Sequence, residues 1–89
     1  MNSGPKETKP KKERVIVLNK ETVYDILNAI ADGLNQKEIV NLLVLHNRNI
    51  KSLRGLEMYI SDLKKINNCT SLGQLMFKHG KGIKFKLKS

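Results

Sequence analysis

Several residue types are scarce in this 89-residue chain, and each scarcity excludes a class of protein. The single cysteine, Cys69, leaves no internal disulfide framework, and its polar NNCTS surroundings make it a weak candidate nucleophile. Tryptophan is absent. No apolar run approaches the roughly 18 residues that cross a membrane, and no signal-peptide pattern opens the chain. We therefore expect one small cytoplasmic domain built on Leu, Ile and Val, with no membrane partner.

Residues that carry chemistry are also few. His46 and His79 are far apart in the sequence and show no metal-ligand spacing with Cys69. There is no phosphate-binding loop, and Glu21, Asp25 and Asp32 are better explained as part of a solvated helix face. We expect no catalytic residues, no metal, no cofactor and no enzymatic activity.

Positive charge is plentiful and unevenly distributed. The net charge is +9, of which residues 1–14 carry +3, residues 15–45 carry −2 and residues 46–89 carry +8. A basic half joined to a mildly acidic half indicates one side that faces a polyanion. The alternative is that the lysines serve only solubility.

The beginning of the chain differs in composition from the rest. Residues 1–13 contain both prolines and no apolar side chain after Met1. This composition predicts a disordered basic tail, followed by one domain over residues 14–89. The β-branched stretch RVIVL, residues 14–18, predicts a short strand.

Three helices are predicted from capping residues and apolar spacing. Asn19 and Asn35 are good N-caps, and Glu38 completes a capping-box pattern after the second. The first helix should end at Gly33, and the second should lead into a polar loop over residues 45–52. The third helix should span about residues 53–66, with Gly55 in its first turn. Its apolar stripe comprises Leu53, Leu56, Ile60 and Leu63, and its opposite face comprises Arg54, Met58, Ser61 and Lys65.

The spacing of apolar residues changes in the last part of the chain. Leu75 and Phe77, and then Ile83, Phe85 and Leu87, alternate mostly with lysine around the sequence HGKG. This alternation predicts a β-hairpin over about residues 75–87, which would also pair with the first strand. The expected fold is therefore α+β: a winged helix-turn-helix with a short N-terminal strand, three helices and a C-terminal β-hairpin wing.

This fold predicts a protein that binds double-stranded DNA and contacts its bases. The third helix would enter the major groove, and the wing would contact the adjacent backbone or minor groove. The candidates for base contact are Arg54, Met58, Ser61, Asp62 and Lys65. The candidates for phosphate contact are Arg48, Lys51 and Lys64, and those for wing contact are His79, Lys81 and Lys84. Asp62 would accept a hydrogen bond from a cytosine amino group or pair with Lys65 on its own helix.

Two stretches resemble the OmpR/PhoB-type winged-helix domain. RGLEMYISDLKK is similar to that family's recognition-helix pattern, and HGKGIKF is similar to its wing pattern. The resemblance implies a sequence-specific double-stranded DNA-binding regulator of transcription, bacterial or phage-like and nucleoid-associated, two copies of which bind repeated half-sites. It also implies an RNA polymerase contact through the loop Leu45–Ser52. Two features depart from the family: Asp62 stands where Arg is usual, and there is no receiver domain.

Two alternatives remain open. ILNAIADGLNQKEIVNLL resembles the opening of LuxR-type helix-turn-helix domains, a fold without a terminal hairpin. That match weakens after Leu43. The second alternative is functional: an adaptor that uses a winged helix to bind RNA polymerase or another regulatory protein.

Overall fold

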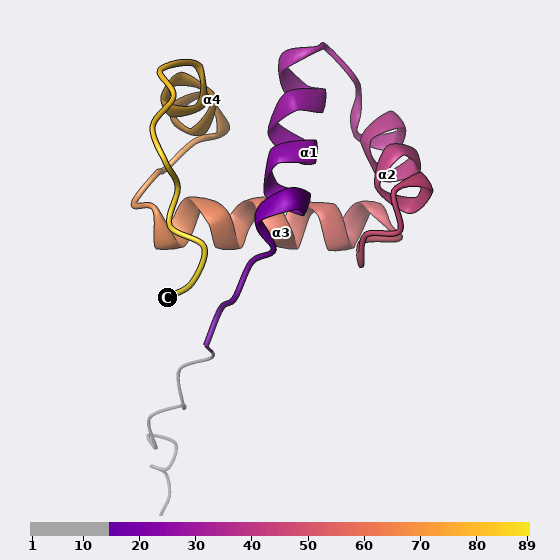
Figure 1. The fold of residues 1–89 in the computed structure, drawn as a ribbon, viewed down its shortest axis with the longest axis horizontal. Helices are drawn as coiled ribbons and strands as arrows, with labels where there is room; N and C mark the ends of the chain where they lie inside the picture. Colours follow the sequence, from indigo (N-terminus) through magenta and orange to yellow (C-terminus); the bar gives the residue numbers. More distant parts are fainter. Residues whose placement is uncertain (1–14) are drawn as a thin grey trace, which may run out of the picture.

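The structure is a computed structural model that describes residues 15–89. Its helices are α1 (Lys20–Ala31), α2 (Gln36–Leu45), α3 (Leu53–Ile66) and α4 (Leu72–Gly80). Figure 1 shows α3 lying horizontally, with α4, α1 and α2 arranged above it from left to right. The predicted tail over residues 1–13 lies outside the described residues.

Each helix begins at a polar residue whose side chain accepts a hydrogen bond from a first-turn backbone N–H. These N-caps are Asn19, Asn35, Ser52 and Ser71. At α2 the capping box is complete, since Asn35 and Glu38 exchange side-chain to backbone hydrogen bonds of 2.8 Å in both directions. The three helices predicted from the sequence are confirmed, and Gly55 lies in the first turn of α3.

Each helix also ends in the same way. One residue past the C-cap, the backbone turns to a positive φ, which reverses the chain direction and stops the helix. Glycine occupies this position after α1 and α4, where Gly33 has φ 85° and Gly82 has φ 74°. After α2 and α3 the same position is taken by Asn47 and Asn68. Asparagine is the residue that tolerates a positive φ next best after glycine.

The predicted hairpin is wrong, and with it the winged helix fold. Leu75 and Phe77 lie in α4, not in a strand, and the HGKG sequence is the end of that helix. A glycine with positive φ serves a hairpin turn and a helix C-terminus equally well, so Gly82 was compatible with both structures. The spacing of Leu72, Leu75 and Met76 is helical, and it places Leu75 in the core while Phe77 is 66% exposed.

The two ends of the described chain pair with each other. Val17 and Lys88 form an isolated antiparallel β-bridge, flanked by hydrogen bonds from Leu18 N–H to the Leu87 carbonyl and from Ser89 N–H to the Ile16 carbonyl. The first segment therefore does pair with the C-terminal segment (residues 83–89), as expected. However, this bridge is the whole of the β-structure in residues 15–89, so the chain is helical there and not α+β.

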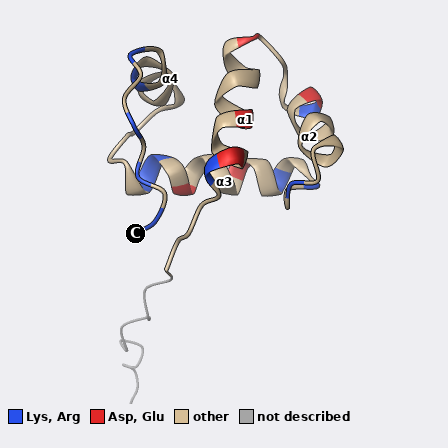
Figure 2. Cartoon of the chain, in the orientation of Figure 1, with Lys and Arg blue, Asp and Glu red and all other residues tan. Residues whose placement is uncertain are grey.

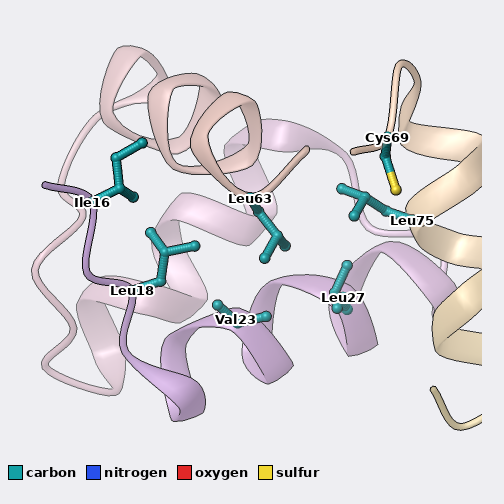
Figure 3. Close-up of a cluster of buried hydrophobic side chains, with 7 residues drawn as sticks. All are labelled: Ile16, Leu18, Val23, Leu27, Leu63, Cys69 and Leu75. Carbon is teal, nitrogen blue, oxygen red and sulfur yellow. The ribbon is translucent and has the colours of Figure 1, made fainter. Parts of the chain in front are cut away.

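The core consists of two hydrophobic clusters. Figure 3 shows the first, made of Ile16, Leu18, Val23, Leu27, Leu63, Cys69 and Leu75. The second is made of Ile26, Ala29, Ile39, Val40, Leu43, Ile50 and Leu56. Helices α1 and α3 contribute to both clusters, and Tyr59 and Ile60 of α3 pack against both. Helix α3 is thereby held on its inner side along much of its length.

Candidate nucleic-acid interface

The outer face of α3 is exposed in the way that the sequence predicted. Leu56 and Leu63 are 0% and 1% exposed on the inner side. The opposite stripe is exposed along the helix and consists of Arg54, Met58, Ser61 and Lys65. Met58 is 49% exposed, which is high for a large apolar side chain. The helix thus presents two cations, a hydroxyl and an apolar group in one row.

Two acidic side chains flank this row. Asp62, the fifth predicted base contact, is half-buried, unlike the four residues of the stripe. Glu57, which the sequence prediction left out, is exposed on the other flank. Its position three residues after Arg54 would have placed it beside the row by helical spacing alone. The outer face of α3 therefore carries a central cationic and apolar row bordered by carboxylates.

Arg48 is engaged within the protein. Its Nε donates to Asp25 Oδ2 at 2.9 Å, and its Nη1 lies 3.4 Å from Glu21 Oε1. His46 Nδ1 lies 3.0 Å from the same Asp25 oxygen. These contacts attach the loop between α2 and α3 to α1, so Arg48 positions the loop instead of standing free for a phosphate.

The ionisation of this cluster follows from its contacts. Partial burial raises the pKa of Asp25, but the hydrogen bonds and charges of His46 and Arg48 outweigh it and hold that pKa below its ordinary value. The hydrogen bond to Asp25, with the charges of Asp25 and Glu21, raises the pKa of Arg48. Both groups are therefore charged at neutral pH.

The remaining phosphate candidates lie near the two ends of α3. Lys51 is exposed, just before Ser52 caps the helix. Lys64 is half-buried in the last turn. Figure 2 shows positive charge around both ends of α3 and along the C-terminal segment.

The three predicted wing residues do not share a wing. His79 Nε2 lies 2.9 Å from Asn28 Oδ1, so this side chain joins α4 to α1. The Lys81 ammonium lies 5.3 Å from the centroid of the exposed Phe77 ring. Lys84 is exposed on the C-terminal segment, close to Lys20 and Tyr24. The charge that the sequence assigned to a hairpin tip is spread over α4 and the segment that follows it.

Within the described part of the chain, no group of three or more His, Cys, Asp or Glu side chains could hold a metal ion. Cys69 is a free, buried thiol of the first cluster, and its sulfur donates to the Asn67 carbonyl at 3.6 Å. No helix among residues 15–89 is long and apolar enough to cross a membrane.

Comparison of the chain with protein-family models, curated proteins and solved structures finds no significant match. The candidate site accordingly rests on the geometry and charge of the chain itself.

Proposed function

We propose that this protein binds double-stranded DNA through the outer face of α3 and regulates transcription. The observation that carries the proposal is the exposed row along α3, which combines Arg54 and Lys65 with Ser61 and Met58 in a chain of net charge +9. The major groove of B-DNA admits an α-helix, and arginine is the commonest specific partner of guanine there. Met58 offers an apolar contact to a thymine methyl group.

The scaffold behind the row supports this function. A reading helix must be held firmly while its outer side chains remain free, and Leu56 and Leu63 anchor α3 in two different clusters. The resemblance of residues 26–43 to LuxR-type domains agrees with a helical protein that has no terminal hairpin. On the same resemblance, we propose that the protein acts in the cytoplasm of a bacterial or phage-like system.

Selection of bound duplexes from a random pool tests the proposal. The wild-type chain should enrich a defined sequence, and Met58→Ala should change the preference at one or two positions. Val44→Ala is the matched control, since Val44 is 48% exposed on α2. This control should leave the selected sequence unchanged. Equal affinity for every duplex tested at low salt would show that α3 does not read sequence.

A second function, binding of a regulatory protein or RNA polymerase, is favoured by one observation. Three apolar residues at the loop Leu45–Ser52 are exposed: Leu45 in the loop by 76%, and Val44 and Leu53 on either side of it by 48% and 47%. Exposed apolar side chains of this kind suit a protein partner. Capture of purified RNA polymerase by the wild-type chain, lost in Leu45→Ala and kept in Met58→Ala, would favour this function over DNA reading.

A further inference from the structure

A groove runs between the C-terminal end of α3 and the end of the chain. It has a volume of about 440 Å³. Three of the described residues that line it are lysines: Lys65 from α3, and Lys86 and Lys88 from the C-terminal segment. None of the described lining residues has an acidic side chain. Figure 2 shows the C-terminal segment passing this end of α3, with positive charge on both.

The backbone of the C-terminal segment is held on two sides. On one side, the Leu18 N–H donates to the Leu87 carbonyl at 2.6 Å, beside the Val17–Lys88 bridge. On the other side, Asn67 at the end of α3 uses its side-chain amide as a strand would use its backbone. Its Oδ1 accepts from the Lys86 N–H at 2.7 Å, and its Nδ2 donates to the Lys86 carbonyl at 3.1 Å.

This attachment places alternate side chains of the segment on an inner and an outer side. Successive side chains of an extended chain point to opposite sides. Phe85 and Leu87 turn inward and pack against the first cluster. Lys84, Lys86 and Lys88 are all exposed. The alternation that suggested a wing strand therefore produces a single extended segment with one cationic edge.

We propose that the groove binds backbone phosphates of DNA next to the base pairs contacted by α3, an inference that rests on the proposed function. Lys65 belongs both to the outer row of α3 and to the groove, so the two surfaces are continuous. Three lysines that line one groove give it positive charge, which attracts a phosphate group. The C-terminal segment thus supplies the backbone contact that a wing would have made.

The salt dependence of binding tests this assignment. Each lysine that neutralises a phosphate contributes about 0.9 to the slope of log affinity against log salt. Lys86→Gln and Lys88→Gln should each lower the steepness of this slope by about that amount. The affinity of each variant should therefore fall roughly threefold less than that of the wild type between about 50 and 200 mM salt. Lys37→Gln, an exposed lysine on α2, should leave the slope unchanged. Matching far-UV circular dichroism will establish that all variants are folded.

The outcomes separate this inference from the proposed function. If the wild-type chain binds a preferred duplex but both groove variants keep the slope of the Lys37→Gln control, the groove assignment is wrong and reading by α3 stands. Lower slopes in the groove variants together with equal affinity for all duplexes would support the groove and refute sequence reading. Tighter binding to an RNA duplex of the same sequence would overturn the assignment to DNA.

Discussion

Asn67 links the end of α3 to the C-terminal segment, and its replacement should loosen that attachment. Its side chain bonds the Lys86 N–H and carbonyl, and it also donates to the Leu63 carbonyl at 2.9 Å. We expect Asn67→Ala to lower the free energy of unfolding by about 1–2 kcal/mol, since several partly exposed hydrogen bonds are lost. Urea unfolding measures this change. Asn41→Ala, at an exposed position on α2, is the control and should not destabilise the chain, because alanine is the better helix former.

Asp25 should make the stability of the protein depend on pH in acid. Because its pKa is lowered in the folded state, the carboxylate contributes stability above the unfolded pKa of about 3.9, and this contribution is lost as pH falls through the lower folded value. Asp25→Asn should therefore be less stable than wild type at pH 7, with the difference shrinking below about pH 4. Thermal unfolding at several pH values measures it. Asp32→Asn, which removes an acid at the C-terminal end of α1, should not destabilise the chain at pH 7.

At the scale of the element, the first turn of α3 leaves room for a larger residue at Gly55. A Cβ added there would lie 3.4 Å from Ser52 Oγ and 3.6 Å from Ile50 Cγ2, which are ordinary contacts. Alanine is favoured over glycine within a helix by about 1 kcal/mol. We therefore expect Gly55→Ala to raise the free energy of unfolding by about 0.5–1 kcal/mol in urea titrations. A decrease would mean that the Ser52 cap is displaced by the added methyl group.

Local signals within each helix decide which elements could be predicted from the sequence. Helices α1, α2 and α3 were predictable because caps and apolar spacing are local signals, and the exposed row of α3 followed from its period. Helix α4 also had a local signal, Ser71 followed by Gln74, since the Ser71 side chain accepts from the Gln74 N–H. The sequence HGKG, with Gly80 at the end of the helix and Gly82 after it, and the alternation of residues 83–87 suggested a hairpin instead.

The groove could not be predicted in this way. It depends on the pairing of Asn67 with Lys86 and on the bridge between Val17 and Lys88, contacts between segments far apart in the sequence. No periodicity specifies such partners. Lysines of the C-terminal segment were recognised as cations that face a polyanion, but their position beside Lys65 is a property of the folded chain.

At the scale of the whole molecule, α3 couples the two hydrophobic clusters, and the described domain should unfold as one unit. Leu56 and Leu63 are fully buried in different clusters, while Leu53 of the same helix is 47% exposed. We expect Leu56→Ala and Leu63→Ala each to cost about 2–5 kcal/mol, the range for a buried leucine. Leu53→Ala, the control of identical chemistry, should cost less than about 1 kcal/mol.

The two hydrophobic clusters should also unfold cooperatively. Tyr59 and Ile60 pack against both clusters, so a cavity in one cluster weakens the support of α3 in the other. Far-UV circular dichroism and tyrosine fluorescence, followed together through urea unfolding, should give coincident single transitions for the wild type and for each variant. If Leu56→Ala separated the two signals into two transitions, the clusters would be independent. The proposed reading of DNA by α3 requires that they are not independent, because Arg54 and Lys65 would keep one orientation only while both ends of α3 are held.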